Sequence, residues 1–388
     1  MRKKNLTVAI LCVALGVSAC GPKFDEEYKT DAEKKIEAEK EEEKEAGKEY
    51  QDKLDAIEPA AYRDVLGLSL EPGAYISVIG KEGSGEYWEQ VKKGAEQAVA
   101  DINDLLGYEG KDEVKLTYSG PEAGDVDGQV NILDEELDRY PAGISISIID
   151  AQSCEVQFDL AAGNSTPIVA FDSASDYQGL MATVSTDNEG TAQMAADKMA
   201  EMLEGSGEIV VFAENSKSMS IEQRQSSFTE RIRSEYPQIT VSDIYYIDAL
   251  EDTKKVMAEE RGTEEPEEIE AISDEEALDY IIEKHPDMKG CFATDGTTVK
   301  EVTEALARAE KEDVTVVGYD GDKEELEALE SGAVDGLVVQ NPFGMGYASV
   351  VATARAALSI GNEAYIDTGA AWVTKENLET PEISGWLY

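Results

Sequence analysis

Four apolar, strand-like segments of the sequence end at an aspartate, and these carboxylates are the side chains whose spacing best suggests chemistry. The pairs are Ile149-Asp150, Phe171-Asp172, Thr294-Asp295 and Tyr319-Asp320. Residues just past the carboxyl ends of parallel strands face the crevice in which open α/β sheets bind ligands. Ionised carboxylates only accept hydrogen bonds, so ligand hydroxyls and amines are their natural partners. Each aspartate could instead cap the following turn or helix, but four together favour a shared site.

A group of carboxylates needs a positive charge beside it, because like charges repel one another. Arg224 opens a helical segment after a strand and is the best candidate, since its five donors can serve both ligand oxygens and carboxylates. It could instead pair at the surface with Glu222 or Glu230. Gln340 ends another strand-like segment and would bring both a donor and an acceptor, or would anchor the loop before Pro342.

Two adjacent aromatic residues, Tyr87 and Trp88, follow the turn Gly83-Ser84-Gly85. Such rings stack on the apolar face of a sugar, although one of them could pack into the core instead. The glycines do not form a dinucleotide-binding fingerprint, and no phosphate-binding lysine motif occurs. Two aspartate-glycine fragments, at 125–128 and 320–322, lack the full calcium-loop pattern. We therefore expect neither a metal nor a cofactor.

The composition narrows the function classes. The chain of 388 residues has 83 acidic and 34 basic side chains, a formal charge of −49, and a single His. Such acidity argues against binding to nucleic acid or to an anionic membrane surface. One His excludes a His-rich zinc site and argues against a His-based triad, whereas carboxylate catalysis stays open. Most of the acidity is expected to be a solvated exterior.

Residues 1–20 have the pattern of a secretory signal: Arg2-Lys3-Lys4, an apolar run too short to span a bilayer, and then Val17-Ser18-Ala19-Cys20. The last four residues resemble a bacterial lipoprotein box, although an ordinary cleaved signal is the alternative. The resemblance implies that Cys20 is lipidated and that two acyl chains anchor the protein at the extracytoplasmic face of the cell membrane. Cys12 would leave with the signal, and for the remaining Cys154 and Cys291 we expect two free buried thiols rather than a disulfide.

The elements that must position these side chains begin after a charged segment. Residues 21–60 are rich in Glu and Lys and are expected to form a solvated tether or an exposed helix. Beyond it, strand-like and helical segments alternate, which predicts parallel sheets covered by helices on both faces, as two sheets or a barrel. The strand-like segments are 74–79, 114–118, 144–149, 167–171, 208–213, 239–246, 290–294, 314–319 and 336–340. The acidic segment 254–276 is expected to be a solvated surface excursion.

Several stretches, taken in order and spacing, resemble the ribose-binding type of periplasmic sugar-binding protein. They are residues 166–172, 184–190, 224–228, 317–321 and 339–342. The resemblance covers about residues 74–388. It implies an α/β fold of two Rossmann-like lobes with parallel sheets, joined by three hinge crossovers, within a body at 61–388. The first lobe would comprise about 74–186 plus 341–369, and the second about 187–340 plus 370–388.

The resemblance also implies roles for the residues above. Tyr87 and Trp88 would stack on the sugar, Asp172, Arg224 and Asp320 would bind its hydroxyls, and Gln340 would lie near the hinge. The family's usual asparagines at two contact positions are Asp150 and Asp295 here, a frequent arginine is Ser173, and an asparagine near the first turn is Gly85. These differences argue against ribose and favour a ligand richer in donors, such as an amino sugar or a different pentose, hexose or polyol.

The resemblance implies capture rather than catalysis. A monosaccharide or related polyol that touches both lobes would stabilise the closed form, and a monomeric, lipid-anchored binding protein would then deliver it to the transmembrane subunits of an ABC importer. The alternatives are a sensory receptor lipoprotein and a nucleoside-binding lipoprotein of the same fold. A more remote alternative is a glycosidase that uses two carboxylates.

Overall fold

The computed structural model describes residues 50–263 and 265–388, all within one unit of the chain. The expected signal peptide, the lipidation site Cys20 and the expected tether as far as residue 49 lie outside the described residues. Within the described residues, no helix combines the length and apolar character that a membrane crossing requires.

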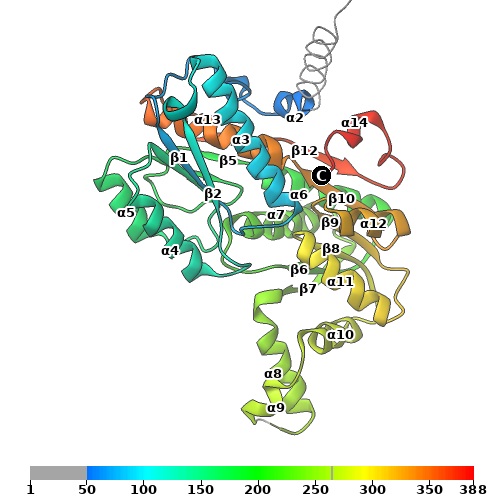
Figure 1. Cartoon of the computed structure of the whole chain (residues 1–388). Helices are drawn as coiled ribbons and strands as arrows, with labels where there is room; N and C mark the ends of the chain where they lie inside the picture. Colours follow the sequence, from blue (N-terminus) through cyan, green and yellow to red (C-terminus); the bar gives the residue numbers. More distant parts are fainter. Residues whose placement is uncertain (1–49, 264) are drawn as a thin grey trace, which may run out of the picture. The chain divides into compact units, whose positions relative to one another are not determined.

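The strands form two six-stranded sheets (Figure 1). All neighbours in the first sheet are parallel, and their order is β11 (Tyr365–Asp367), β5 (Thr183–Ser185), β4 (Ile168–Phe171), β3 (Gly143–Ile146), β1 (Tyr75–Ile79), β2 (Lys115–Ser119). The second sheet is parallel except for its edge strand β12. Its order is β12 (Ala370–Val373), β10 (Gly336–Gln340), β9 (Thr315–Tyr319), β8 (Met288–Ala293), β6 (Gly207–Ala213), β7 (Ile239–Tyr246).

The inner strands β1, β3, β4 and β5 of the first sheet are buried on both faces, which explains why they are mostly apolar. The edge strands β2 and β11 are partly exposed. In β4, Val169 and Phe171 join the core under α3 (Glu86–Leu106) and α13 (Pro342–Ala357). Ile168 and Ala170 point to the other face and join the core under α4 (Val126–Leu137) and α5 (Glu155–Gly163). Successive strand residues alternate between faces, so one short segment supplies both cores.

The second sheet is built in the same way. In β6, Ile209 and Val211 pack under α6 (Asn188–Met202) and α7 (Met219–Glu235). Val210 and Phe212 face the opposite core, which also receives residues of α10 (Asp274–Lys284), α11 (Gly296–Arg308) and α12 (Lys323–Ser331). The remaining helices are α2 (Gln51–Asp55), α8 (Leu250–Glu260), α9 (Pro266–Glu270) and α14 (Pro381–Ser384), with short 3-10 turns at Ala60–Tyr62, Gly110–Asp112 and Ile247–Ala249.

The chain crosses between the sheets three times: after β5, after β10 and after β11. The crossings lie side by side, because Thr368 N donates to Ser185 O (3.1 Å) and Asn341 Nδ2 donates to Thr368 O (2.9 Å). The expected α/β fold of two lobes with parallel sheets and three crossovers is thus confirmed, and the barrel is excluded.

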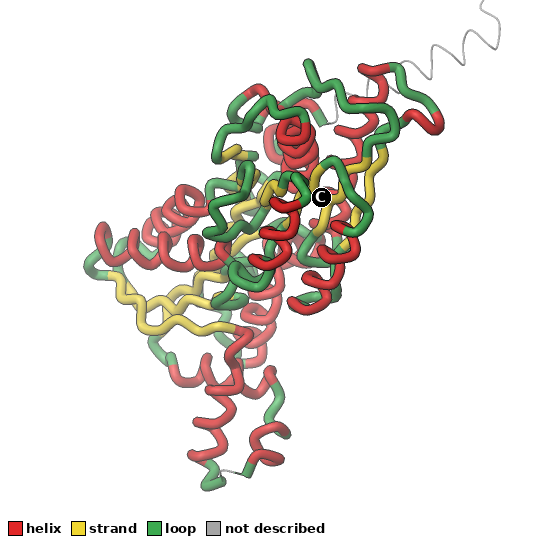
Figure 2. The backbone as a smooth tube through the Cα atoms, turned by 90° about the vertical axis from the view of Figure 1, so that its left-hand side faces the viewer, coloured by secondary structure: helices red, strands yellow, loops and turns green. Residues whose placement is uncertain are grey.

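Two segments pack more than the sequence pattern indicated. Ile57, placed in the expected tether, is fully buried in the first-lobe core, and the Tyr50 ring stacks on Phe343 at 4.2 Å between centroids. The acidic excursion forms α8 and α9, which extend away from the second sheet (Figures 1 and 2). Met257 and Ile272 anchor it in the second-lobe core. A few apolar residues are enough to anchor this acidic segment, because only one side of each helix packs against the rest of the protein.

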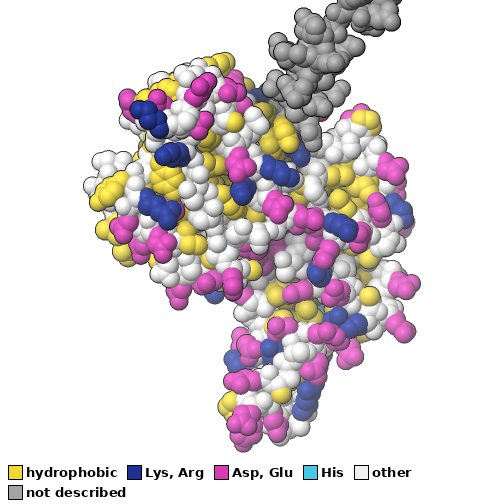
Figure 3. Space-filling view, viewed as in Figure 1, with side chains coloured by type: hydrophobic (Ala, Val, Ile, Leu, Met, Phe, Trp, Pro, Cys, Tyr) yellow, Lys and Arg dark blue, Asp and Glu magenta, His cyan; other side chains and the backbone are white. Residues whose placement is uncertain are grey.

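The expected charged exterior is visible in the space-filling view, in which Asp and Glu side chains are scattered over that face and are frequent on the α8–α9 segment (Figure 3). Cys154 lies at the start of α5 and Cys291 on β8, and both are free and buried. They belong to different lobes, and no disulfide joins them.

Candidate ligand-binding site

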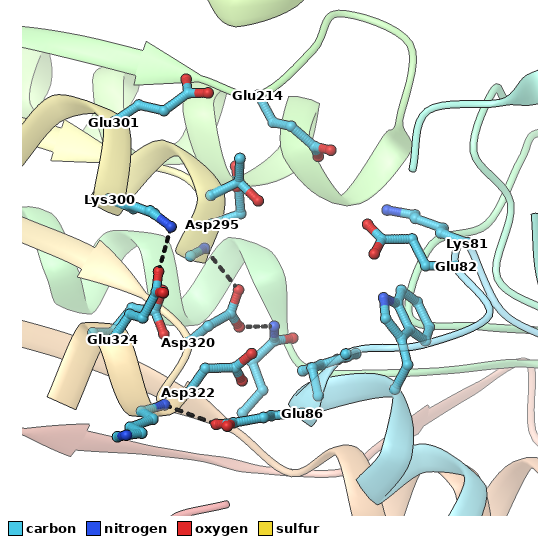
Figure 4. A pocket seen from close by; sticks show the side chains of 18 of the residues that line it. Lys81, Glu82, Glu86, Glu214, Asp295, Lys300, Glu301, Asp320, Asp322 and Glu324 are labelled. Atoms are coloured by element: carbon cyan, nitrogen blue, oxygen red, sulfur yellow. Dashed lines mark hydrogen bonds and ion pairs between the residues drawn. The ribbon is translucent and has the colours of Figure 1, made fainter. Parts of the chain in front are cut away.

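A cavity of about 790 Å³ lies where the carboxyl ends of the strands of both sheets meet. Pockets of this size are typical of small-molecule sites. Side chains from both lobes line it, and Figure 4 shows Lys81, Glu82 and Glu86 from the first lobe facing Glu214, Asp295 and Asp320 from the second.

Seven of the eight residues expected to bind ligand line this one cavity. They are Tyr87, Trp88, Asp172, Arg224, Asp295, Asp320 and Gln340. They come from both lobes and from six separate stretches of sequence. The fold therefore brings together residues that lie as much as 253 positions apart in the sequence.

Asp150 is the exception, and it does not line the cavity. Strand β3 ends at Ile146, three residues earlier than the apolar run suggested, so Ser147 takes the strand-end position. The Asp150 carboxylate accepts a hydrogen bond from Gln152 N at 2.9 Å, which is the turn-capping alternative.

Asp172 is the most heavily bonded carboxylate of the first lobe. It follows β4 with a left-handed backbone (φ 55°), and its carboxylate accepts hydrogen bonds from Ser147 Oγ (2.6 Å) and Tyr87 OH (3.2 Å). Burial alone would raise its pKa, but the positive charges of Lys81 and Arg224 outweigh burial and hold the pKa below the ordinary value. Asp172 is therefore a fixed, ionised acceptor at neutral pH.

Lys81 is a site residue that the sequence reasoning missed. Its Nζ lies 3.4 Å from Asp172 Oδ2 and donates to Ser218 Oγ of the other lobe at 2.9 Å. Ser173, which stands where the family often has arginine, contacts Ser218 Oγ at 3.0 Å. The positive charge beside Asp172 is thus supplied from the loop after β1. One lysine among 34 basic residues gives no signal of this role.

Arg224, on the first turns of α7, is 3 % exposed, which rules out the surface pairings. It donates to Asn188 Oδ1 (2.8 Å), Thr294 O (2.9 Å) and Gln340 Oε1 (2.8 Å), and its guanidinium lies 4.2 Å from the centre of the Tyr319 ring. Burial would lower its pKa, but neighbouring Asp320 raises it above the ordinary value. Among the described residues these three bonds leave two of its five N–H groups for a ligand.

Asp320 and Gln340 form the floor of the cavity beside the hinge. Gln340 Nε2 donates to Asp320 Oδ1 at 2.6 Å, and Gln340 Oε1 also accepts from Thr186 Oγ1 at 3.0 Å. Gly296 N donates to Asp320 Oδ2 at 3.0 Å. Burial raises the pKa of Asp320 although Arg224 opposes the shift. Gln340 therefore links the site to the second crossing and also anchors it.

Asp295 both lines the cavity and caps a helix, so the two readings of this residue are compatible. Its carboxylate accepts from Thr298 N (3.0 Å) and Thr298 Oγ1 (2.8 Å) at the start of α11.

The two aromatic residues differ in exposure. Trp88 is 8 % exposed and meets the Phe171 ring edge-on at 6.5 Å, so much of it belongs to the first-lobe core. Tyr87 contacts Trp88 edge-on at 5.0 Å and Tyr388 at 6.0 Å, and its hydroxyl reaches Asp172. Trp88 therefore packs largely into the core, which is the alternative given above for one of the two rings. Both rings nevertheless line the cavity.

The cavity is more acidic than the strand-end aspartates suggested, because twelve of its twenty-four lining residues are Asp or Glu and four are Lys or Arg. Burial, with Asp295 nearby, raises the pKa of Glu214 to about 7. Burial and Asp320 raise the pKa values of both Asp322 and Glu325 to about 7. In a chain with 83 acidic residues these positions look like ordinary surface charges.

The lobes touch around the cavity. Lys323 N donates to Glu86 Oε2 at 2.9 Å, and Ala151 N donates to Lys217 O at 3.2 Å. Together with Lys81 on Ser218, these contacts hold the two walls against each other. In the part of the chain that the structure describes, no group of three or more His, Cys, Asp or Glu is arranged to hold a metal ion.

Comparison with known proteins gives the same fold. Residues 76–363 match the family model described as periplasmic binding protein domain. The D-allose-binding periplasmic protein of Escherichia coli K12 is 22 % identical over 296 residues, which cover 73 % of this chain and 85 % of that protein.

Two solved structures resemble the chain over most of its length. A carbohydrate transporter solute-binding protein from Agrobacterium radiobacter, in complex with D-arabinose, is 29 % identical with a TM-score of 0.68, covering 81 % of this chain and 99 % of its own. An ABC transporter solute-binding protein from Agrobacterium vitis, with bound D-fucose, is 23 % identical with a TM-score of 0.67, covering 81 % and 100 %. Because the family model spans most of the sequence and the two-lobed fold agrees with it, the chain belongs to the periplasmic binding protein family.

Proposed function

We propose that the protein is the substrate-binding component of an ABC-type sugar importer and that it captures a monosaccharide or related polyol between its lobes. The observation that carries the proposal is the shared cavity, in which fixed acceptors and donors from both lobes surround a space of small-molecule size. The relatives that bind D-allose, D-arabinose and D-fucose support a sugar as the ligand class.

The contacts follow from the chemistry of each side chain. Asp172 and Asp320 accept hydrogen bonds from ring hydroxyls, and Arg224 donates its two remaining N–H groups to ring oxygens. Tyr87 and the exposed part of Trp88 cover an apolar face of the ring. Asp295 offers a further acceptor, and Gln340 holds the floor. Lys81 belongs to this set because it keeps Asp172 ionised.

Capture works by closure. A ligand that bonds to Asp172 in one lobe and to Arg224 and Asp320 in the other binds the closed form more tightly than the open form, and it shifts the population by that difference. Lys81 on Ser218 and Glu86 on Lys323 N are contacts between lobes that closure makes or tightens. No covalent chemistry is needed.

Delivery and location complete the proposal. Lipidation of Cys20 would hold the protein at the extracytoplasmic face of the membrane, where the closed form presents the sugar to the permease. The protein acts as a monomer and not as an enzyme.

A binding experiment on the full chain tests the proposal. Isothermal titration and thermal shift are measured with D-allose, D-arabinose, D-fucose, D-glucose, D-galactose, ribitol and adenosine. At 100 times its dissociation constant a true ligand stabilises the protein by about 2.7 kcal/mol. Asp172→Asn should abolish the response, whereas the matched control Asp150→Asn should keep it, because Asp150 lies outside the cavity. Silence towards every sugar and polyol would reject the proposal, a response to adenosine alone would favour the nucleoside-binding alternative, and turnover of nitrophenyl glycosides would favour the glycosidase.

A further inference from the structure

One wall of the cavity consists of three carboxylates that the sugar contacts above use only in part. This acidic wall is formed by Asp320 after β9, Asp322 at the N-cap of α12 and Glu325 in the first turn of α12. Figure 4 shows Asp320 and Asp322 next to one another, with Glu86 beyond them. Glu325 lies beside the same strand end, since a Cβ placed on Gly296 would be 2.9 Å from Glu325 Oε1 and 3.5 Å from Asp320 Cβ.

Two oxygens of the acidic wall are buried without a hydrogen-bond partner among the described residues. They are Asp322 Oδ1 and Glu325 Oε2, and the Glu325 residue is only 6 % exposed. A buried carboxylate oxygen without a donor is costly. Native proteins leave few such groups, and each needs a physical explanation.

The basic residues near the wall are committed elsewhere. Lys300 Nζ pairs with Glu324 at 2.7 Å, and Lys323 Nζ pairs with Glu327 at 3.7 Å. Arg224 donates to Asn188, Thr294 and Gln340, and among the wall carboxylates its charge acts on Asp320. Within residues 50–263 and 265–388, neither Asp322 nor Glu325 forms an ion pair with Lys, Arg or His. The missing positive charge must therefore come from outside this set.

We propose, on the basis of the sugar-binding function above, that the ligand is a monosaccharide carrying a primary ammonium group that is seated against Asp320, Asp322 and Glu325. An ammonium brings three donors and a positive charge to three carboxylates, two of which have an oxygen without a partner. A neutral hydroxyl brings one donor and leaves the charges uncompensated. A metal ion is the other cation to consider, but the described residues hold no set arranged for one.

The electrostatics of the acidic wall agree with this ligand. Burial and Asp320 raise the pKa values of Asp322 and Glu325 to about 7, with a further contribution from Glu86 at Asp322 and from Asp322 at Glu325. The Tyr388 hydroxyl faces the same three carboxylates, and burial and their charges raise its pKa well above the ordinary value. An ammonium between Asp322 and Glu325 would lower the pKa values of both, so its binding releases protons near neutral pH. The affinity for an amine should therefore rise from pH 6 to pH 8, provided that the amine stays protonated, whereas the affinity for a neutral sugar should change little.

Titration of the full chain with matched sugars tests the inference. Each of D-glucose, D-galactose and D-allose is compared with its 2-amino-2-deoxy and 6-amino-6-deoxy derivatives, and the neutral pentose D-arabinose is included. At least one amino sugar should bind about tenfold or more tighter than its parent at pH 7.5, as expected for charge-assisted hydrogen bonds. For 6-amino derivatives, whose amine remains protonated, the preference should shrink at pH 6.

Variants of the acidic wall separate charge recognition from folding. Glu325→Gln and Asp322→Asn should each lower amino-sugar affinity about tenfold more than they lower the affinity for the neutral parent. They should also raise the melting temperature of the ligand-free protein, because each removes a buried charge. The matched control Glu330→Gln, an exposed position of α12 outside the cavity, should change neither quantity.

The outcomes distinguish the inference from the function on which it rests. A neutral sugar that binds as tightly as or more tightly than all of its amino derivatives would overturn the ammonium inference and leave the sugar-binding proposal standing. An amino-sugar preference that survives Glu325→Gln and Asp322→Asn would also overturn it, because the ammonium would then sit elsewhere. Absence of binding by every neutral and amino sugar would reject the proposed function and the inference together.

Discussion

Replacement of Lys81 by Met should expose how much the buried pair with Asp172 contributes to folding and binding. The two charged atoms lie 3.4 Å apart, and the side chains are 15 % and 7 % exposed. At an effective dielectric of about 20 their attraction is about 5 kcal/mol. Arg224, Ser147 and Tyr87 continue to stabilise the carboxylate, so we expect a net loss of about 3 kcal/mol, the lower end for a broken buried pair.

The pH dependence gives this prediction a sign. In the native protein the pKa of Asp172 is lowered, so its stabilising effect is present above the unfolded-state pKa and is lost as the pH falls through the folded-state pKa. Without Lys81, burial pushes that pKa upward, and protonation at low pH then relieves the unpaired charge. The difference in unfolding free energy between the native protein and Lys81→Met should therefore shrink from pH 7 to pH 3.

Urea denaturation at both pH values measures the effect, and two further variants control for it. Lys255→Met removes an exposed pair with Asp252, whose side chains are 56 % and 82 % exposed, and should cost less than about 0.5 kcal/mol. The double variant Lys81→Met/Asp172→Asn should regain most of the lost stability, because no charge remains buried alone. A loss below about 1 kcal/mol in Lys81→Met, or a double variant no more stable than the single one, would refute the reasoning.

Three further predictions concern the arginine, the helix packing and the raised carboxylate. Arg224→Lys should weaken sugar binding by about tenfold or more in calorimetry, because an ammonium cannot reproduce the guanidinium fork, whereas Arg231→Lys on the outer part of α7 should leave affinity unchanged. Gly94→Ala should lower the unfolding free energy by about 3 kcal/mol, since its Cβ would lie 1.9 Å from a backbone carbonyl oxygen of α13. Gly163→Ala, which has open space around the added Cβ, is the control. Equal melting temperatures of the two variants would contradict the packing argument. Glu214→Gln should raise the melting temperature at pH 8 by roughly 2–4 °C, because a carboxyl with its pKa raised to about 7 destabilises the fold once ionised. This gain in melting temperature should vanish near pH 5, where the carboxyl is protonated. A gain that grows on acidification would contradict the prediction.

The sequence indicated much of the fold because the strands are buried on both faces. Runs such as 167–171 and 209–213 are apolar throughout, and this pattern is typical of short strands in a parallel sheet covered on both sides. Order and spacing of five motifs then favoured two lobes over a barrel. The sequence pattern did not predict helix α13, because nearly all of its residues are buried and it has no amphipathic stripe.

The cavity-lining residues that could be predicted from the sequence are those whose position is marked by a neighbouring element. Asp172, Asp295 and Asp320 each follow a strand, and the strand itself marks their position. Asp150 lies outside the cavity because β3 stops at Ile146, and an apolar run does not reveal where hydrogen bonding between strands stops.

Only the tertiary structure could assign Lys81, Glu214, Asp322 and Glu325 to the site. Their residue types are common in this chain, and only their neighbours in the folded structure distinguish them. Lys81 lies beside a buried aspartate, and the three acids lie near other carboxylates in a shared cavity. Local sequence fixes which face of a strand or helix a side chain occupies. Burial, repulsion and the absence of a partner depend on groups distant in the chain, so they come into existence only when the chain folds and brings those groups together.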